Sequence, residues 1–122
     1  VSGIAPAWFN VLDLSAIYDH VDRPVIDVTF EESPGLEETL RSEFDGEARH
    51  RRLERYRDLP PRHELLINDQ RRFVRTVGCS TDHARTVLEA FTPEGGRPEP
   101  LRVARLAARA FDVFRRTENP EA

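Results

Sequence analysis

Asn10 and Asp13 are the two residues whose types and spacing could best support chemistry. They are three positions apart, so on a helix they point to the same side, and they closely follow residues 1–4, which we interpret as the end of a buried strand. Ligand sites of α/β sheets lie where such strands end, and an amide and a carboxylate there could hold a metal ion or position a phosphate. The alternative is structural, with Asn10 capping the helix and Asp13 facing the positive end of its dipole.

A basic stripe near the C-terminus is the second candidate. Arg102, Arg105 and Arg109 follow one another at i, i+3 and i+7, and Arg115 and Arg116 extend the charge. Arginine forks suit phosphate oxygens, so the stripe could contact nucleic acid. The alternative is an exposed face whose last arginines interact favourably with the helix dipole.

The other reactive residue types form no catalytic pattern. The histidines lack partners at metal-ligand spacing, and we interpret them as solvated surface residues: His20, His50, His63 and His83. The single cysteine, Cys79, excludes an internal disulfide, and we expect it to be buried at a strand end. Gly95 and Gly96 precede an arginine and not the lysine and hydroxyl residue of a P-loop.

Hydrophobic periodicity predicts where the helices and strands lie. We expect helices over residues 10–21, 36–44, 47–57 and 100–116, and one after Ser80 that contains Ala84, Val87, Leu88 and Phe91. Strands are expected over residues 1–4, 24–30 and 72–77, and residues 65–67 form either a short strand or a connector. Ser80 is a predicted N-cap, and Glu47 and Arg51 are spaced for an exposed ion pair. We interpret residues 47–57 as a solvated helix face, because acids interrupt its arginines. The last helix is expected to bury the stripe of Val103, Ala104, Ala107, Phe111 and Phe114.

The order of these elements predicts the fold class. Strands that alternate with helices imply crossover connections and a largely parallel sheet flanked by helices, an α/β fold. Residues 25–30 place apolar side chains on both faces, as expected for a sheet covered on both sides, and Asp27 among them is expected to form an ion pair or a strand-end hydrogen bond. The strands are few, so at least one sheet edge is expected to be open, as in part of a larger domain.

Composition limits the classes of function. The 122 residues fit one domain, and 39% hydrophobic against 33% charged residues exclude a disordered tail and a membrane protein. The basic residues are 18 arginines, and the 22 acids give a net charge of −4, which is not typical of a general nucleic-acid coat protein. No targeting signal is recognisable, and with the lone cysteine this favours the cytoplasm.

Two stretches carry a resemblance to a known family. One is Gly3-Ile4-Ala5 with Phe9-Asn10-Val11-Leu12-Asp13 and then Arg23-Pro24-Val25-Ile26, and the other is Pro98-Glu99-Pro100-Leu101-Arg102-Val103-Ala104 after a glycine-containing loop. They resemble the archaeal endonuclease dU family, which is related to endonuclease V. The resemblance runs along the whole chain but covers only about the later two thirds of a typical family member.

This resemblance implies an RNase H-like fold and an enzyme that nicks DNA near deoxyuridine. It implies Mg²⁺ held by carboxylates, with Asp13 as a metal ligand and catalytic residue, Asn10 beside it orienting the substrate, and Arg102 and Arg105 contacting DNA. Arg105 stands where the family often has histidine. The family's leading aspartate pair would lie upstream of Val1, so residues 1–122 are expected to be a single partial domain that is inactive alone.

Two other classes of function stay open. The chain could be a non-catalytic α/β module that binds a protein partner, or a second copy of itself, through its open sheet edge. It could also bind nucleic acid through the arginine stripe alone.

Overall fold

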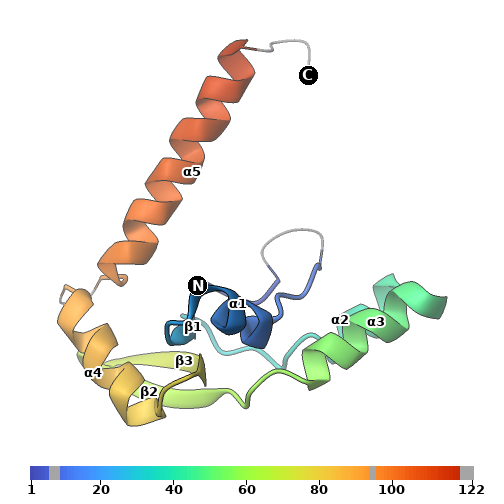
Figure 1. The fold of residues 1–122 in the computed structure, drawn as a ribbon, viewed down its shortest axis with the longest axis horizontal. Helices are drawn as coiled ribbons and strands as arrows, with labels where there is room; N and C mark the ends of the chain where they lie inside the picture. The colour runs from blue at the N-terminus through green and yellow to red at the C-terminus, as the bar shows by residue number, and fades with distance from the viewer. Residues whose placement is uncertain (6–8, 94–95, 119–122) are drawn as a thin grey trace.

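The computed structural model describes residues 1–5, 9–93 and 96–118 (Figure 1). Its elements are, in chain order, α1 (Leu14–Val21), β1 (Val25–Thr29), α2 (Glu37–Glu43), α3 (Gly46–Arg57), β2 (His63–Ile67), β3 (Gln70–Val77), α4 (Thr81–Phe91) and α5 (Glu99–Glu118). Most predicted elements are confirmed within a few residues. The first helix is shorter than predicted, because it begins at Leu14 and not near Asn10.

The three strands form an antiparallel sheet in the order β1-β3-β2. The predicted parallel sheet is therefore wrong. The physical reason lies at Asn68 and Asp69, which have φ angles of +49° and +65° and form the tight turn between β2 and β3. This turn sends β3 straight back along β2, so these two strands form a hairpin and need no crossover helix.

The N-terminal residues lie along the free edge of β1. The amino group of Val1 donates to the Ile26 carbonyl at 2.7 Å, and the Val28 amide donates to the Val1 carbonyl at 2.9 Å. Bonds to the residues on either side of Asp27 are the pattern of parallel strands. The strand predicted over residues 1–4 is thus reduced to this one pairing, and it runs in the same direction as β1.

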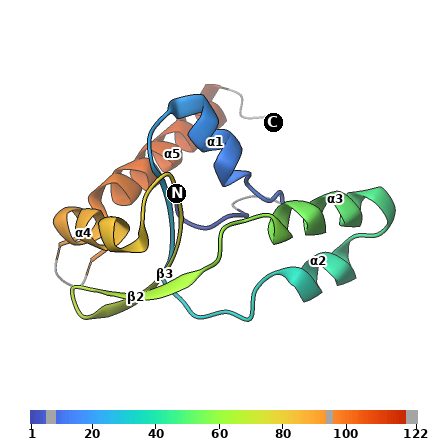
Figure 2. The ribbon, with the colours of Figure 1, turned by 60° about the horizontal axis from the view of Figure 1, so that its bottom comes forward.

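Apolar clusters cover both faces of the sheet, as the sequence predicts. Val25 and Val77 contribute to the cluster under α1, which extends to α2 and α3, whereas Val28 and Val74 contribute to the cluster under α4. The two pairs point to opposite faces because side chains alternate along a strand. Figure 2 shows α1 and α4 separated in this way, with α2 and α3 side by side at the far end of the molecule.

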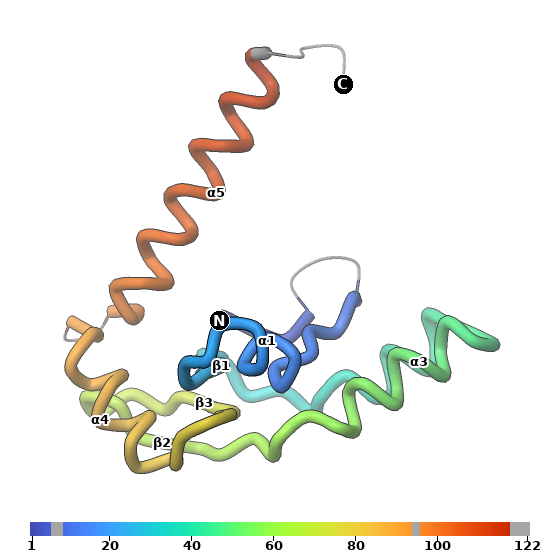
Figure 3. Tube along the Cα trace, viewed as in Figure 1, coloured from blue at the N-terminus to red at the C-terminus, as the bar shows by residue number. Residues whose placement is uncertain are grey.

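α5 extends away from the sheet (Figure 3). Its first turn is attached through Leu101, which packs against the cluster under α4. Beyond that point its apolar face is exposed: Val103, Leu106, Phe111, Val113 and Phe114 are 50–62% exposed. The stripe predicted to be buried is therefore exposed, because no other described element packs along it.

Among the described residues, no helix is both long and apolar enough to cross a membrane.

Candidate functional site

Asp13 is the N-cap of α1. Its backbone is extended, with φ −93° and ψ 94°, and its Oδ1 accepts a hydrogen bond from the Ala16 amide at 3.0 Å. Asn10 lies outside the helix, and its Oδ1 accepts from Arg52 Nη2 at 3.3 Å. The expectation that Asn10 caps the helix is therefore wrong, because the helix begins three residues later and Asp13 satisfies its first amides.

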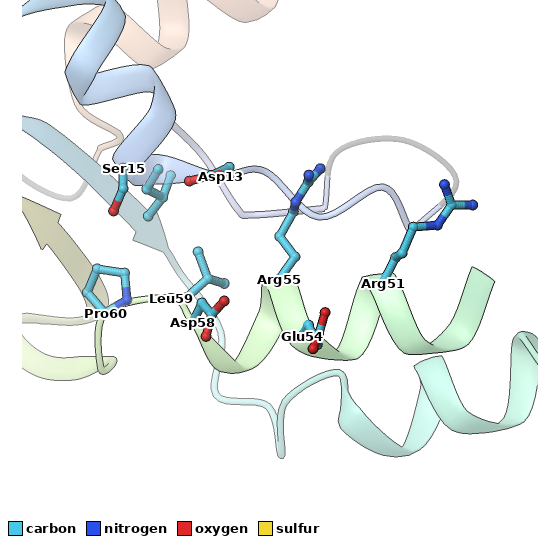
Figure 4. Close-up of a pocket in the computed structure, with 9 residues that line it drawn as sticks. Asp13, Ser15, Arg51, Glu54, Arg55, Asp58, Leu59 and Pro60 are labelled. Atoms are coloured by element: carbon cyan, nitrogen blue, oxygen red, sulfur yellow. The ribbon is translucent and has the colours of Figure 1, made fainter. Parts of the chain in front are cut away.

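A cavity of about 440 Å³ opens between Asp13 and α3 (Figure 4). Its lining residues are Asp13, Leu14, Ser15, Arg51, Glu54, Arg55, Asp58, Leu59 and Pro60. In Figure 4, the side chains of Arg51 and Arg55 rise from α3 toward the segment that carries Asp13. The cavity thus combines carboxylates with arginines, and Asp13 is the member that the sequence had already singled out.

The described part of the chain shows no cluster of metal-ligating side chains. It contains no group of three or more histidine, cysteine, aspartate or glutamate side chains placed to hold a metal ion. One carboxylate oxygen of Asp13 is already engaged as the helix cap. Mg²⁺ usually keeps several waters and is held by one or two carboxylates, and the second oxygen of Asp13 is free of the helix cap.

A second cavity, of about 240 Å³, is lined by Asn10, Val11, Arg51, Arg52 and Arg55, and we call it the arginine cavity. Sequence reasoning missed it, because residues 47–57 were interpreted as a solvated face. The predicted Glu47–Arg51 ion pair is not formed; His50 and Glu54 pair instead, at 3.3 Å. The signal was the spacing of the three arginines at i, i+1 and i+4, which gathers them at the side of α3 that faces Asn10.

Arg102 and Arg105 lie in other surroundings. Arg102 forms a two-pronged ion pair with Glu99, in which its Nε is 2.9 Å from Oε2. This pairing raises the pKa of Arg102 and lowers the pKa of Glu99. Arg105 lines a mostly apolar cavity of about 460 Å³ with residues that include Val1 and Leu101. That cavity shares no residue with the one beside Asp13, so the structure does not bring the predicted site residues together into one pocket.

Two further ionisable groups are explained by packing. Asp27 is 1% exposed, accepts from the Gly3 amide at 2.8 Å and pairs with Arg75 at 3.7 Å, which confirms the predicted ion pair. Burial raises its pKa in spite of these partners. Cys79 is half-buried, and burial also raises the pKa of its thiol, which disfavours the reactive thiolate.

Comparison with known proteins identifies the family. Residues 1–112 match the family described as endonuclease dU, and the chain belongs to this family. It is 35% identical over 114 residues to a UPF0215 protein of Thermococcus kodakarensis, a match that covers 90% of this chain and 55% of the relative. It is also 35% identical over 112 residues to a UPF0215 protein of Deinococcus radiodurans, covering 88% and 54% of the two chains.

A solved structure supports the fold. The crystal structure of a protein of unknown function from Archaeoglobus fulgidus matches with a TM-score of 0.73 and 27% identity, over 89% of this chain and 60% of that one. The chain therefore spans a little over half the length of the relatives it matches. Membership of an endonuclease family suggests a nuclease-related function, although these relatives are themselves named only as uncharacterised proteins.

Proposed function

We propose that this chain is the later part of a metal-dependent endonuclease that nicks DNA at deoxyuridine. The observation that carries the proposal is the family match over residues 1–112, which includes every predicted site residue: Asn10, Asp13, Arg102 and Arg105. The substrate is a product of cytosine deamination, so the activity would belong to the repair of deaminated DNA.

An RNase H-like sheet is part of the proposal, and two features support it. The parallel pairing of Val1 beside the antiparallel strands makes this edge of the sheet a mixed one, as the family resemblance implies. The apolar face of α5 begins beside residues 1–3, because Val1 and Gly3 line one cavity together with Leu101 and Ala104 of the first turns of α5. Further strands added beside residues 1–3 would therefore lie under α5 and cover its exposed side chains.

Asp13 has a defined part in this proposal. Its helix-capping oxygen is occupied by the Ala16 amide, and Oδ2 is the oxygen that remains for a metal ion. Mg²⁺ is the cation that the family implies, and the family resemblance implies further carboxylate ligands in the part of the domain that this chain does not span. The two arginines would contact DNA, with Arg102 using Nη1, the guanidinium nitrogen outside its hydrogen bonds to Glu99.

The test compares this chain alone with a completed protein. The completed protein joins residues 1–122 to the part of the Thermococcus kodakarensis relative that lies outside the aligned region. Both are incubated with Mg²⁺ and a labelled duplex containing one deoxyuridine, and a duplex with thymidine in its place is the control. We expect the completed protein to nick the deoxyuridine duplex and the chain alone to leave both duplexes intact.

Either of two results would contradict the proposal. A completed protein that melts cooperatively but does not nick would refute nuclease activity. If the isolated chain nicks at the same rate as the completed protein, the proposal that this chain lacks part of the metal site is refuted. Circular dichroism melting of both proteins shows that a negative result is not a failure to fold.

The exposed face of α5 favours a second candidate, a non-catalytic module that binds a protein or a second copy of the chain. Five large apolar side chains that are 50–62% exposed on one helix exceed what isolated surface hydrophobics explain. Apolar association survives high salt, whereas binding through arginine and phosphate weakens steeply. Sedimentation of the isolated chain at low and high salt separates the two, because a salt-resistant dimer would support the module.

A further inference from the structure

We propose that the arginine cavity binds a backbone phosphate of nucleic acid. The inference rests on the proposed function, because it assigns part of the DNA-contacting surface of the same protein. It adds a binding site on α3, remote in sequence from the arginine stripe of α5.

Charge is the first step. Many arginines of the described chain lie within 4.0 Å of a carboxylate, namely Arg41, Arg57, Arg71, Arg75, Arg85, Arg102 and Arg116. Arg51, Arg52 and Arg55 form no such pair with any described residue, a property that they share with other arginines such as Arg49, and they differ from these in lining one cavity together. No acid lines the arginine cavity, although Arg51 and Arg55 also line the larger cavity beside it together with Asp13, Glu54 and Asp58. Like charges one helical turn apart on an exposed face repel weakly, so an anion bound among these arginines would be favoured.

The fixed position of Arg52 is the second step. Its Nη1 donates to the Ala48 carbonyl at 3.0 Å, its Nη2 donates to Asn10 Oδ1 at 3.3 Å, and its guanidinium lies 3.9 Å from the centre of the Phe44 ring. Its Nε is buried and has no hydrogen-bond partner in the described structure. A cation held in place before its ligand arrives loses little conformational entropy on binding. Asn10 thus acts as a positioning residue for Arg52.

Arg51 and Arg55 complete the cavity. Both are exposed, and both project from α3 toward the segment before α1 (Figure 4). With Arg52 they place three cationic forks around about 240 Å³. Arginine forks donate parallel hydrogen bonds to phosphate oxygens, and a phosphodiester offers such oxygens at a strongly charged centre. A nucleic-acid backbone is therefore the ligand that this geometry and the proposed function favour together.

The experiment measures binding and does not need turnover. Fluorescence anisotropy of a short labelled duplex with the 122-residue chain gives the dissociation constant over a series of NaCl concentrations, without Mg²⁺. The variants are Arg51→Gln and Arg55→Gln, and Arg49→Gln is the matched control. Arg49 is an exposed arginine of the same helix that does not line the cavity, so all three variants change the net charge equally.

We expect Arg51→Gln and Arg55→Gln each to weaken binding and to reduce the slope of log K against log salt by about 1. Between ~0.05 M and ~0.2 M salt the loss of affinity should then be about threefold smaller than for the unchanged chain. Arg49→Gln should keep the full slope. Thermal melting of each variant checks the fold.

Three results would overturn the inference. The first is an equal effect of all three variants, which would show general attraction to a basic helix. The second is no effect of Arg51→Gln and Arg55→Gln. The third is arginine-dependent binding of polyglutamate and not of DNA, which would indicate an acidic protein partner. A completed protein that binds DNA through Arg51 and Arg55 but does not nick it would refute the proposed function alone.

Discussion

The carboxylate of Asp27 and the guanidinium of Arg75 face each other across β1 and β3, with 3.7 Å between Oδ2 and Nη1 and side chains only 1% and 10% exposed. Arg75 is held in place by its Nε, which donates to the Pro60 carbonyl at 3.1 Å. Two buried charges are costly to desolvate, and their attraction only partly offsets that cost. The raised pKa of Asp27 shows that desolvation dominates at this carboxylate.

The first prediction is that Asp27 makes stability depend on pH. Its pKa is above the ordinary value of 3.8 in the folded protein, so the folded state binds this proton more tightly than the unfolded state. The resulting stabilisation is complete below about pH 3.8 and is lost as the pH rises through the raised pKa. Each unit of the shift corresponds to about 1.4 kcal/mol.

Asp27→Asn tests this prediction, because an amide keeps an oxygen for the Gly3 amide and does not titrate. Urea unfolding of both proteins from pH 4 to pH 7 should show the free energy of unfolding of the unchanged chain falling relative to that of Asp27→Asn. Parallel pH profiles would mean that Asp27 is not the titrating group.

The second prediction concerns Gly78, which has a φ of +84°. A Cβ at this position would lie 2.3 Å from Cε2 of Tyr18, so Gly78→Ala forces either the turn after β3 or α1 to move. Gly3 has nearly the same φ, +86°, but open space around its Cβ position. We expect Gly78→Ala to lower the free energy of unfolding by about 1–3 kcal/mol more than Gly3→Ala, because only Gly78→Ala creates a steric overlap.

Urea unfolding of the two alanine variants measures this difference. Adding Tyr18→Ala to each should shrink the gap between them, since the overlapping ring is then removed. If Gly78→Ala and Gly3→Ala lower the free energy of unfolding equally, the positive φ causes the loss and the overlap with Tyr18 does not.

Local chemistry made much of the fold predictable. Ser80 is the N-cap of α4, as predicted, because its hydroxyl accepts from the His83 amide at 3.1 Å. Caps and glycine breaks depend on a few neighbouring residues, so the sequence displays them directly. The direction of β3 has a signal in the sequence, since Asn68 and Asp69 are residues that favour a hairpin turn, but the alternation of strands and helices predicts crossovers and hides it.

The candidate site was less predictable, because it depends on contacts between distant segments. Asn10 and Arg52 are 42 positions apart, and no local sequence pattern predicts the hydrogen bond between them. The spacing of Phe111 and Phe114 correctly indicates an amphipathic helix. Hydrophobic periodicity does not show whether another element covers the apolar face of that helix.

The third prediction follows from that exposed face. The native chain should bind the dye ANS (8-anilinonaphthalene-1-sulfonate), and replacing Leu106 and Phe114 by glutamine should lower the fluorescence, because these side chains are 52% and 60% exposed on α5. Arg109→Gln, on the basic side of the same helix, is the control and should leave the fluorescence unchanged. Fluorescence that the double substitution leaves unchanged would show that the dye binds to another surface.

The last prediction separates the two roles of Asp13. As the N-cap of α1 it stabilises the helix, so Asp13→Ala should lower the free energy of unfolding by about 1 kcal/mol, whereas Asp13→Ser keeps a capping oxygen for the Ala16 amide and should cost far less. In its proposed role as a metal ligand it would act through its second carboxylate oxygen, which serine and alanine both lack. In the completed protein, nicking of the deoxyuridine duplex should therefore be lost in both variants, while only Asp13→Ala melts at a lower temperature. If Asp13→Ser nicks like the unchanged protein, Asp13 is a helix cap alone, and the metal ligands must be sought among other residues.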